Sequence, residues 1–150
     1  MRIIRRTQIM KAIAVIALLA LVTVPALAHH SFAMYDTSIE KTMTGKLIRF
    51  VVGANHSQYV FQVVNPDGSL ANDSKGEPLI WNVETTAASQ LARAGITVET
   101  FKIGTVFTIT FSPLRDGRNG GAQRGNSLIT CGMKLPEGGC NEKTGKKFAS

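Results

Sequence analysis

Apolar and polar positions alternate along five segments of the chain, and this period of two predicts β-strands. The segments are rich in β-branched and aromatic residues and are separated by clusters of Gly, Pro and Asn. We expect strands at 42–52, 57–64, 79–84, 106–113 and 126–134. Alternate residues of the first strand should share one face, namely Met43, Gly45, Leu47, Arg49 and Val51. A glycine this early in the strand suggests a bulge.

One segment between the third and fourth strands has a helical pattern instead. Residues 87–94 are rich in Ala, follow the capping residues Thr85 and Thr86, and end at Gly95. Three small or apolar side chains should face inwards at helical spacing: Ala88, Leu91 and Ala92. Three strands, one short helix and two strands is the element order of an OB-type barrel. The sequence therefore predicts a mainly β fold, a small five-stranded OB-like barrel. An open antiparallel sheet or sandwich carrying one helix is the alternative.

The first 28 residues have the pattern of a secretory signal peptide. Basic residues precede the largely apolar run 12–24, which is followed by Pro25 and by Ala26-Leu27-Ala28. Crossing a membrane requires about 20 apolar residues, more than this run supplies. We therefore expect cleavage between Ala28 and His29, a periplasmic or secreted mature protein, and no membrane span after cleavage. The sequence leaves open whether translation starts at Met1 or at Met10.

Removal of residues 1–28 changes the charge balance considerably. The whole chain has 17 basic and 10 acidic residues and a net charge of +7, but four of the basic residues lie in 1–28. The mature chain would keep 13 basic and 10 acidic residues, so its charge gives little reason to expect a nucleic-acid partner. We expect an extended arm at 29–41, the barrel domain at 42–140 and a disordered basic tail at 141–150.

Six short motifs stand out along the mature chain. The first three are His29-His30-Ser31-Phe32, Thr44-Gly45-Lys46-Leu47 and Asn55-His56-Ser57. The others are Trp81-Asn82-Val83-Glu84, Leu91-Ala92-Arg93-Ala94-Gly95 and Pro113-Leu114-Arg115-Asp116-Gly117. Together they resemble one family of small exported bacterial proteins, a domain-of-unknown-function family whose mature chains start with His-His-Ser-Phe. The resemblance covers most of the mature chain and implies export and a small β-rich fold, without an assigned activity.

The three histidines of the chain suggest a metal site. Cleavage before His29 would create a free α-amine, which can chelate a metal together with the ring of the same residue. A second imidazole would complete a set of three nitrogens that suits Cu(II). His56 is the main candidate for that ring, and His30 is an alternative ligand. Glu84 and Asp36 are candidates for orienting the rings. The alternative is an exposed N-terminus that carries histidines without binding metal.

Two further groups of residues could have a role. Cys131 and Cys140 are the only cysteines, and in an exported protein such a pair favours a disulfide over a thiolate metal site. The glycine-rich segment 115–125 contains Arg115, Arg118 and Arg124. It is either a loop that binds an anionic ligand or, as we favour, a mobile solvated loop.

Motifs typical of common enzymes are missing from the sequence. It contains no G-x-x-x-x-G-K-[ST] phosphate loop, no G-x-S-x-G elbow and no H-E-x-x-H motif. We therefore favour an exported binding module for an unknown small ligand, with copper as the candidate metal. A copper-dependent oxidoreductase that uses the same histidines is one alternative. A metal-free module that binds a partner of the cell envelope is the other.

Overall fold

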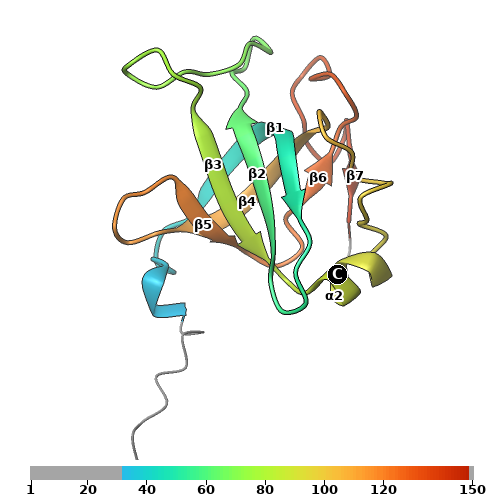
Figure 1. Cartoon of the computed structure of the whole chain (residues 1–150). Coiled ribbons are helices and arrows are strands. Elements are labelled where there is room, and N and C mark those ends of the chain that lie inside the picture. The colour runs from blue at the N-terminus through green and yellow to red at the C-terminus, as the bar shows by residue number, and fades with distance from the viewer. Residues whose placement is uncertain (1–31, 149–150) are drawn as a thin grey trace, which may run out of the picture. The chain divides into compact units, whose positions relative to one another are not determined.

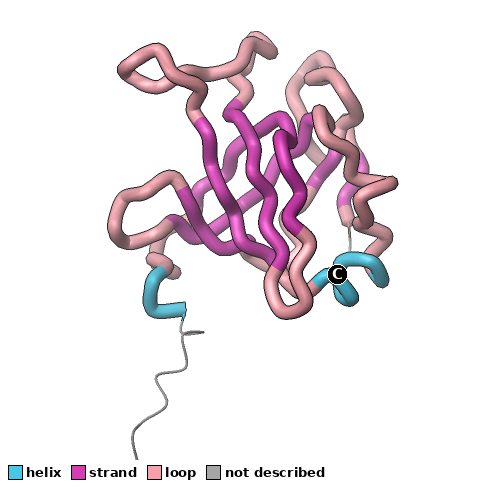
Figure 2. The backbone as a smooth tube through the Cα atoms, in the orientation of Figure 1, coloured by secondary structure: helices cyan, strands magenta, loops and turns pink. Residues whose placement is uncertain are grey.

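The computed structural model describes residues 32–148, which form a mainly β structure (Figures 1 and 2). The elements, in chain order, are the 3₁₀ turn η1 (Phe32–Met34), β1 (Lys41–Val51), β2 (Ser57–Val63), β3 (Ile80–Thr85), α2 (Ala88–Arg93), β4 (Val106–Pro113), β5 (Gly120–Gln123), β6 (Ile129–Thr130) and β7 (Lys146–Lys147). Within residues 32–148, no helix is long and apolar enough to cross a membrane.

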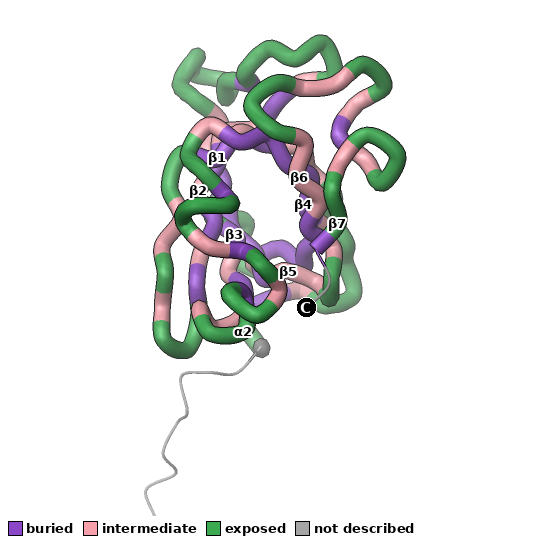
Figure 3. The backbone as a smooth tube through the Cα atoms, turned by 90° about the vertical axis from the view of Figure 1, so that its right-hand side faces the viewer, coloured by how far each residue is buried: buried purple, intermediate pink, exposed green. Residues whose placement is uncertain are grey.

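Five of the strands close into a barrel (Figure 3). The strand order is β1-β2-β3-β5-β4, and β4 pairs again with β1 to complete the circle. The β3–β5 pair is parallel, whereas the other four pairs of the barrel are antiparallel. This confirms the predicted OB-like barrel, with its one short helix between the third and fourth strands, and excludes the open sheet.

Aromatic side chains fill the barrel. Phe107 lies at the centre of the core, and its ring centroid is 5.1 Å from those of Phe61 and Phe101. Tyr59 packs edge-on against Phe101, with the ring centroids 5.2 Å apart. All four rings are at most 1% exposed. Burial of such large apolar surfaces is the main favourable contribution to folding in a domain of this size.

Strand β1 departs from simple alternation at one position. The register with β2 shifts between Leu47 and Arg49, so Ile48 is the bulged residue. Leu47 is buried whereas Arg49 is exposed, so the predicted common face of these residues is wrong beyond the bulge. Gly45 has a different role from the predicted one. A Cβ atom there would lie 2.1 Å from Phe61 Cδ2, so the glycine allows the ring to pack directly on the backbone.

The fifth barrel strand lies in a different place from the predicted one. Gly120–Gln123, within the segment expected to be a mobile loop, pairs with both β3 and β4. Of the predicted strand 126–134, only Ile129–Thr130 forms a strand, β6. This strand carries glycines because its backbone packs directly on its neighbours. A Cβ atom on Gly121 would lie 2.3 Å from the Phe111 ring. Because glycine has no side chain, such a strand lacks the alternation of apolar and polar residues from which strands are predicted.

The short helix is shorter than predicted and begins differently. Ala87 is its N-cap, and no side chain caps it. Thr85 instead ends β3, where its hydroxyl donates a 2.6 Å hydrogen bond to Gln123 Oε1. Leu91 is buried as expected, whereas Ala92 is exposed. Gly95 follows the helix with a φ of +80°, which confirms its expected role as the terminating residue.

Residues 141–148 pack against the barrel, so the predicted disordered tail is wrong over these described residues. Cys131 and Cys140 form the expected disulfide. Beyond it, Lys146–Lys147 pairs with β6 as strand β7. Phe148 is 6% exposed and packs against the main core. One apolar residue after the basic run therefore anchors the segment, and the barrel unit extends past residue 140.

Candidate functional site

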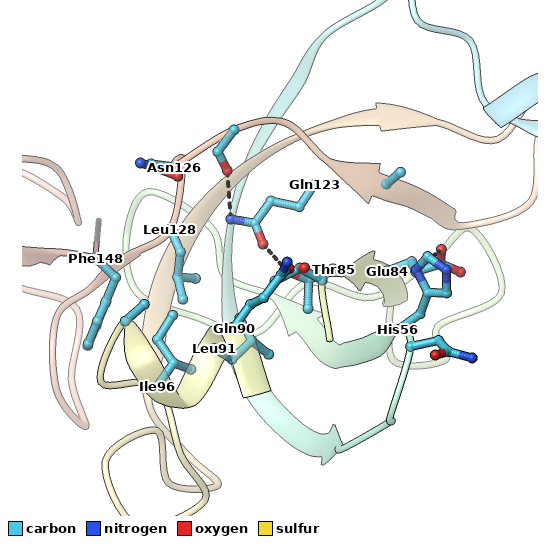
Figure 4. Close-up of a pocket in the computed structure, with 15 residues that line it drawn as sticks. His56, Glu84, Thr85, Gln90, Leu91, Ile96, Gln123, Asn126, Leu128 and Phe148 are labelled. Carbon is cyan, nitrogen blue, oxygen red and sulfur yellow. Dashed lines mark hydrogen bonds and ion pairs between the residues drawn. The ribbon is translucent and has the colours of Figure 1, made fainter. Parts of the chain in front are cut away.

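The side chains of His56 and Glu84 are in contact at one end of the barrel (Figure 4). His56 Nδ1 lies 3.1 Å from Glu84 Oε1, and the side chains are 42% and 32% exposed. The strand register explains their proximity. Ser57 pairs with Thr85 across the β2–β3 ladder, which brings the residue before β2 beside the penultimate residue of β3.

The loop that carries His56 is held in place by backbone contacts. Gly53 packs so closely that a Cβ atom there would lie 1.9 Å from the His56 carbonyl oxygen. The Gly53 carbonyl accepts a 3.0 Å hydrogen bond from the Ala88 amide at the start of α2. The Ser57 amide donates to the Thr86 carbonyl at 3.0 Å. The imidazole therefore projects from a loop that is tied to both β3 and the helix.

A second side chain, that of Tyr35, reaches Glu84 from residues 33–40, which we call the N-terminal arm. Burial raises the pKa of Tyr35 to about 12, and the negative charge of Glu84, with a hydrogen bond from the phenol to that carboxylate, contributes further to the rise. Tyr35 is 6% exposed and forms a β-bridge with Leu114. The carboxylate of Glu84 thus joins the arm to the loop that carries His56.

Two arginines of the segment 115–125 hold this arm against the barrel. Arg115 donates from Nε to the Ala33 carbonyl at 3.1 Å, and its Nη1 lies 3.8 Å from Asp36. Arg124 donates from Nη1 to the Thr37 carbonyl at 2.8 Å. The Arg124 Nε also pairs with Glu40 Oε1 at 3.0 Å. Both guanidinium groups therefore bind the chain's own N-terminal arm.

The third arginine of this segment behaves differently. Arg118 pairs with Asp116 of the same loop, at 2.8 Å from Nε to Oδ2. Its amide also donates to that carboxylate, and these hydrogen bonds are the main cause that lowers the pKa of Asp116. Arg118 thus has a local partner and makes no contact with the arm. These contacts do not test whether the three arginines bind an anionic ligand. They give Arg115 and Arg124 a structural role, because both side chains hold the arm against the barrel.

The remaining predicted site residues are divided between described and undescribed parts of the chain. His29, His30 and the Ala28–His29 junction lie outside the described residues, as does the predicted signal segment. Within residues 32–148, no three His, Cys, Asp or Glu side chains lie close enough together to hold a metal ion. The described part therefore supplies a single imidazole with an adjacent carboxylate.

Comparison with known proteins places the chain in a family. Residues 16–123 match DUF6152, a family of unknown function. The chain belongs to the DUF6152 family. No curated protein and no solved structure matches the chain. The expected resemblance to a domain-of-unknown-function family is thereby confirmed, while export and the His-His-Ser-Phe start of mature chains stay predictions.

The DUF6152 match includes His56, Glu84 and Tyr35, and it stops at the end of β5. A cavity of about 330 Å³ opens beside His56 in this DUF6152 chain. It lies among the end of β3, helix α2, the β5–β6 connection and Phe148 (Figure 4). The sequence indicated Glu84 as a partner of the histidine and Tyr35 as a residue that could pin the N-terminal arm to the barrel. It did not connect Tyr35 with Glu84 or indicate Gln123 and the cavity, because their proximity depends on the barrel's closure.

Proposed function

We propose that this DUF6152 chain is an exported binding module that holds copper between its mature N-terminus and His56. The observation that supports this most strongly is the contact between His56 Nδ1 and the Glu84 carboxylate. A metal-binding imidazole commonly donates its second ring N–H to a carboxylate, which fixes the ring and its tautomer. His56 has such a partner in Glu84 at 3.1 Å.

The position of the carboxylate determines which nitrogen would bind the metal. An imidazole that donates Nδ1–H to Glu84 has its lone pair on Nε2, the nitrogen on the opposite side of the ring. Glu84 also receives the Tyr35 phenol, so the carboxylate is fixed from two sides. A ring held in this way loses little freedom when it binds a metal, which favours affinity.

The other two nitrogens of the proposed site would come from His29. Its α-amine, created by cleavage after Ala28, and its imidazole would chelate the same ion. Phe32–Met34 is the 3₁₀ turn η1, so the reach of His29 is set by the three residue steps before Phe32, about 10 Å at full extension. The proposal requires this span to bring His29 to His56. Three nitrogens in a tetragonal arrangement favour Cu(II) over the other common metals.

The test is spectroscopic and uses the chain that begins at His29. Its Cu(II) electron paramagnetic resonance spectrum should show coupling to three nitrogens. The same chain acetylated on the His29 α-amine loses that nitrogen as a ligand without gaining another, and we expect a changed spectrum and an affinity weaker by about 100-fold. His30→Ala is the matched control and should keep the spectrum. Identical spectra with and without the acetyl group would refute the proposal.

A further inference from the structure

A cavity lies beside helix α2. Gln90 and Leu91 of this six-residue helix line it, and Ala94 follows on the cavity wall. The space of about 330 Å³ is at the lower end of the range for small-molecule sites, about 300–1,000 Å³. Its position differs from that of the proposed metal site, because only its edge is formed by His56 and Glu84 (Figure 4).

The walls of the cavity divide into an apolar side and a polar side. The apolar side consists of aliphatic side chains and one aromatic ring from the helix, the β6 region and the C-terminal segment: Leu91, Ala94, Ile96, Leu128 and Phe148. The polar side carries four carboxamides, those of Asn55, Gln90, Gln123 and Asn126, and the hydroxyls of Thr85 and Thr86. Figure 4 shows the Gln90, Gln123 and Thr85 side chains converging there.

The polar side is built into the fold. Thr85 is 8% exposed and donates to Gln123 Oε1 at 2.6 Å. Gln123 Nε2 in turn donates to the Gly125 carbonyl at 3.1 Å. These two bonds fix the orientation of the Gln123 carboxamide. A carboxamide has a donor beside an acceptor, and a ligand amide has the same pair in the complementary arrangement.

Charge limits the ligand further. Of the fifteen side chains and backbone segments that line the cavity, only His56 and Glu84 are ionisable, and they pair with each other. A net charge on the ligand would therefore be desolvated without a counter-ion, which is unfavourable. A neutral ligand with an amide group and one apolar side chain satisfies both walls.

We propose that this cavity binds a small neutral amide with an apolar side chain, such as a blocked hydrophobic amino acid. The proposal does not depend on copper, because the residues that carry it, Gln90, Gln123 and the apolar wall, are not among the proposed copper ligands. A ligand of this class would place its amide against Gln123 and Gln90 and its side chain against Leu91, Ile96 and Leu128.

The test uses the metal-free chain that begins at His29 and N-acetyl-leucinamide as the probe. Titration followed by amide NMR should give shifts confined to the segments that line the cavity, 55–56, 84–96, 121–128 and residue 148, with a dissociation constant of about 1 mM or tighter. N-acetyl-leucine, which has the same shape and a negative charge, should bind at least about tenfold more weakly. Isobutanol, which lacks the amide, should also bind at least about tenfold more weakly.

Two variants distinguish the cavity from other surfaces. Ala94→Phe fills the cavity and should weaken binding by about tenfold or more, whereas Ser89→Phe on the exposed side of the same helix should leave it unchanged. If Ala94→Phe does not fold, Gln90→Leu is the second variant. It removes a carboxamide from the polar side of the cavity and should weaken binding severalfold. Absence of shifts at about 10 mM probe, equal binding of the charged analogue, or equal binding to the Ser89 and Ala94 variants would overturn the proposal.

Discussion

Replacement of Arg124 should release the N-terminal arm from the barrel. In Arg124→Gln, the arm loses a charge-assisted hydrogen bond to the Thr37 carbonyl and the ion pair with Glu40. A hydrogen bond from a charged group contributes about 1.5 kcal/mol. The ion pair contributes about 0.5 kcal/mol at most, since Glu40 is 61% exposed. The docked arm should therefore be destabilised by about 1–2 kcal/mol.

Amide hydrogen exchange measures this loss directly. The Asp36 amide donates to the Pro113 carbonyl at 2.8 Å only while the arm is docked. A loss of 1–2 kcal/mol should accelerate its exchange by about 5- to 30-fold, because about 1.4 kcal/mol corresponds to a factor of ten. Amides of the β2–β3 ladder should exchange at an unchanged rate, since the barrel itself does not depend on the arm.

The matched control is Arg118→Gln. This arginine lies in the same loop, but its partner is Asp116 and not the arm. It should leave the exchange of the Asp36 amide unchanged. Equal exchange in the wild type and in Arg124→Gln, or equal acceleration by both variants, would refute the idea that this arginine holds the arm.

Three other outcomes follow from the fold. Phe148→Ala should lower the free energy of unfolding by about 3 kcal/mol, because it removes a buried ring. Chemical denaturation measures this loss, and an unchanged midpoint would mean that the C-terminal segment does not pack on the core. Replacing Cys131 and Cys140 together by Ser should lower the free energy of unfolding by about 2–3 kcal/mol relative to the oxidised wild type. The reduced wild type is the control and should match the variant. The neutral form of Tyr35 is favoured in the folded state, so the free energy of unfolding should fall as the pH rises from about 10 to about 12. Tyr35→Phe should reduce that fall, and an identical pH profile of the variant would contradict the raised pKa.

The sequence was sufficient for the elements whose side chains alternate. Strand β4 was predicted with the bounds that it has in the structure, and the element order was enough to predict barrel closure. Strand β5 could not be recognised, because Gly120 and Gly121 are required for close approach to Leu114 and Phe111 and carry no pattern. The bulge at Ile48 was equally hidden, since it is defined only by the partner strand.

The candidate site shows the same division. His56 could be selected because histidines are rare in the chain, and Glu84 could be named as an orienting carboxylate. Their 3.1 Å contact depends on the β2–β3 register, which no local pattern determines. Arg124 resembled a solvated loop residue because its contacts lie more than eighty residues away in the arm. Phe148 resembled part of a disordered tail because it is a single apolar residue after a basic run.

The most direct test of the copper proposal is a competition titration of Cu(II) into the chain that begins at His29. The account predicts that His56→Ala weakens Cu(II) binding by about 100-fold or more, and that Glu84→Gln weakens it by about tenfold, because the imidazole then loses the carboxylate that orients it. Both variants change partly exposed side chains, so the barrel should remain folded. An affinity for His56→Ala within about twofold of the wild type would contradict the account.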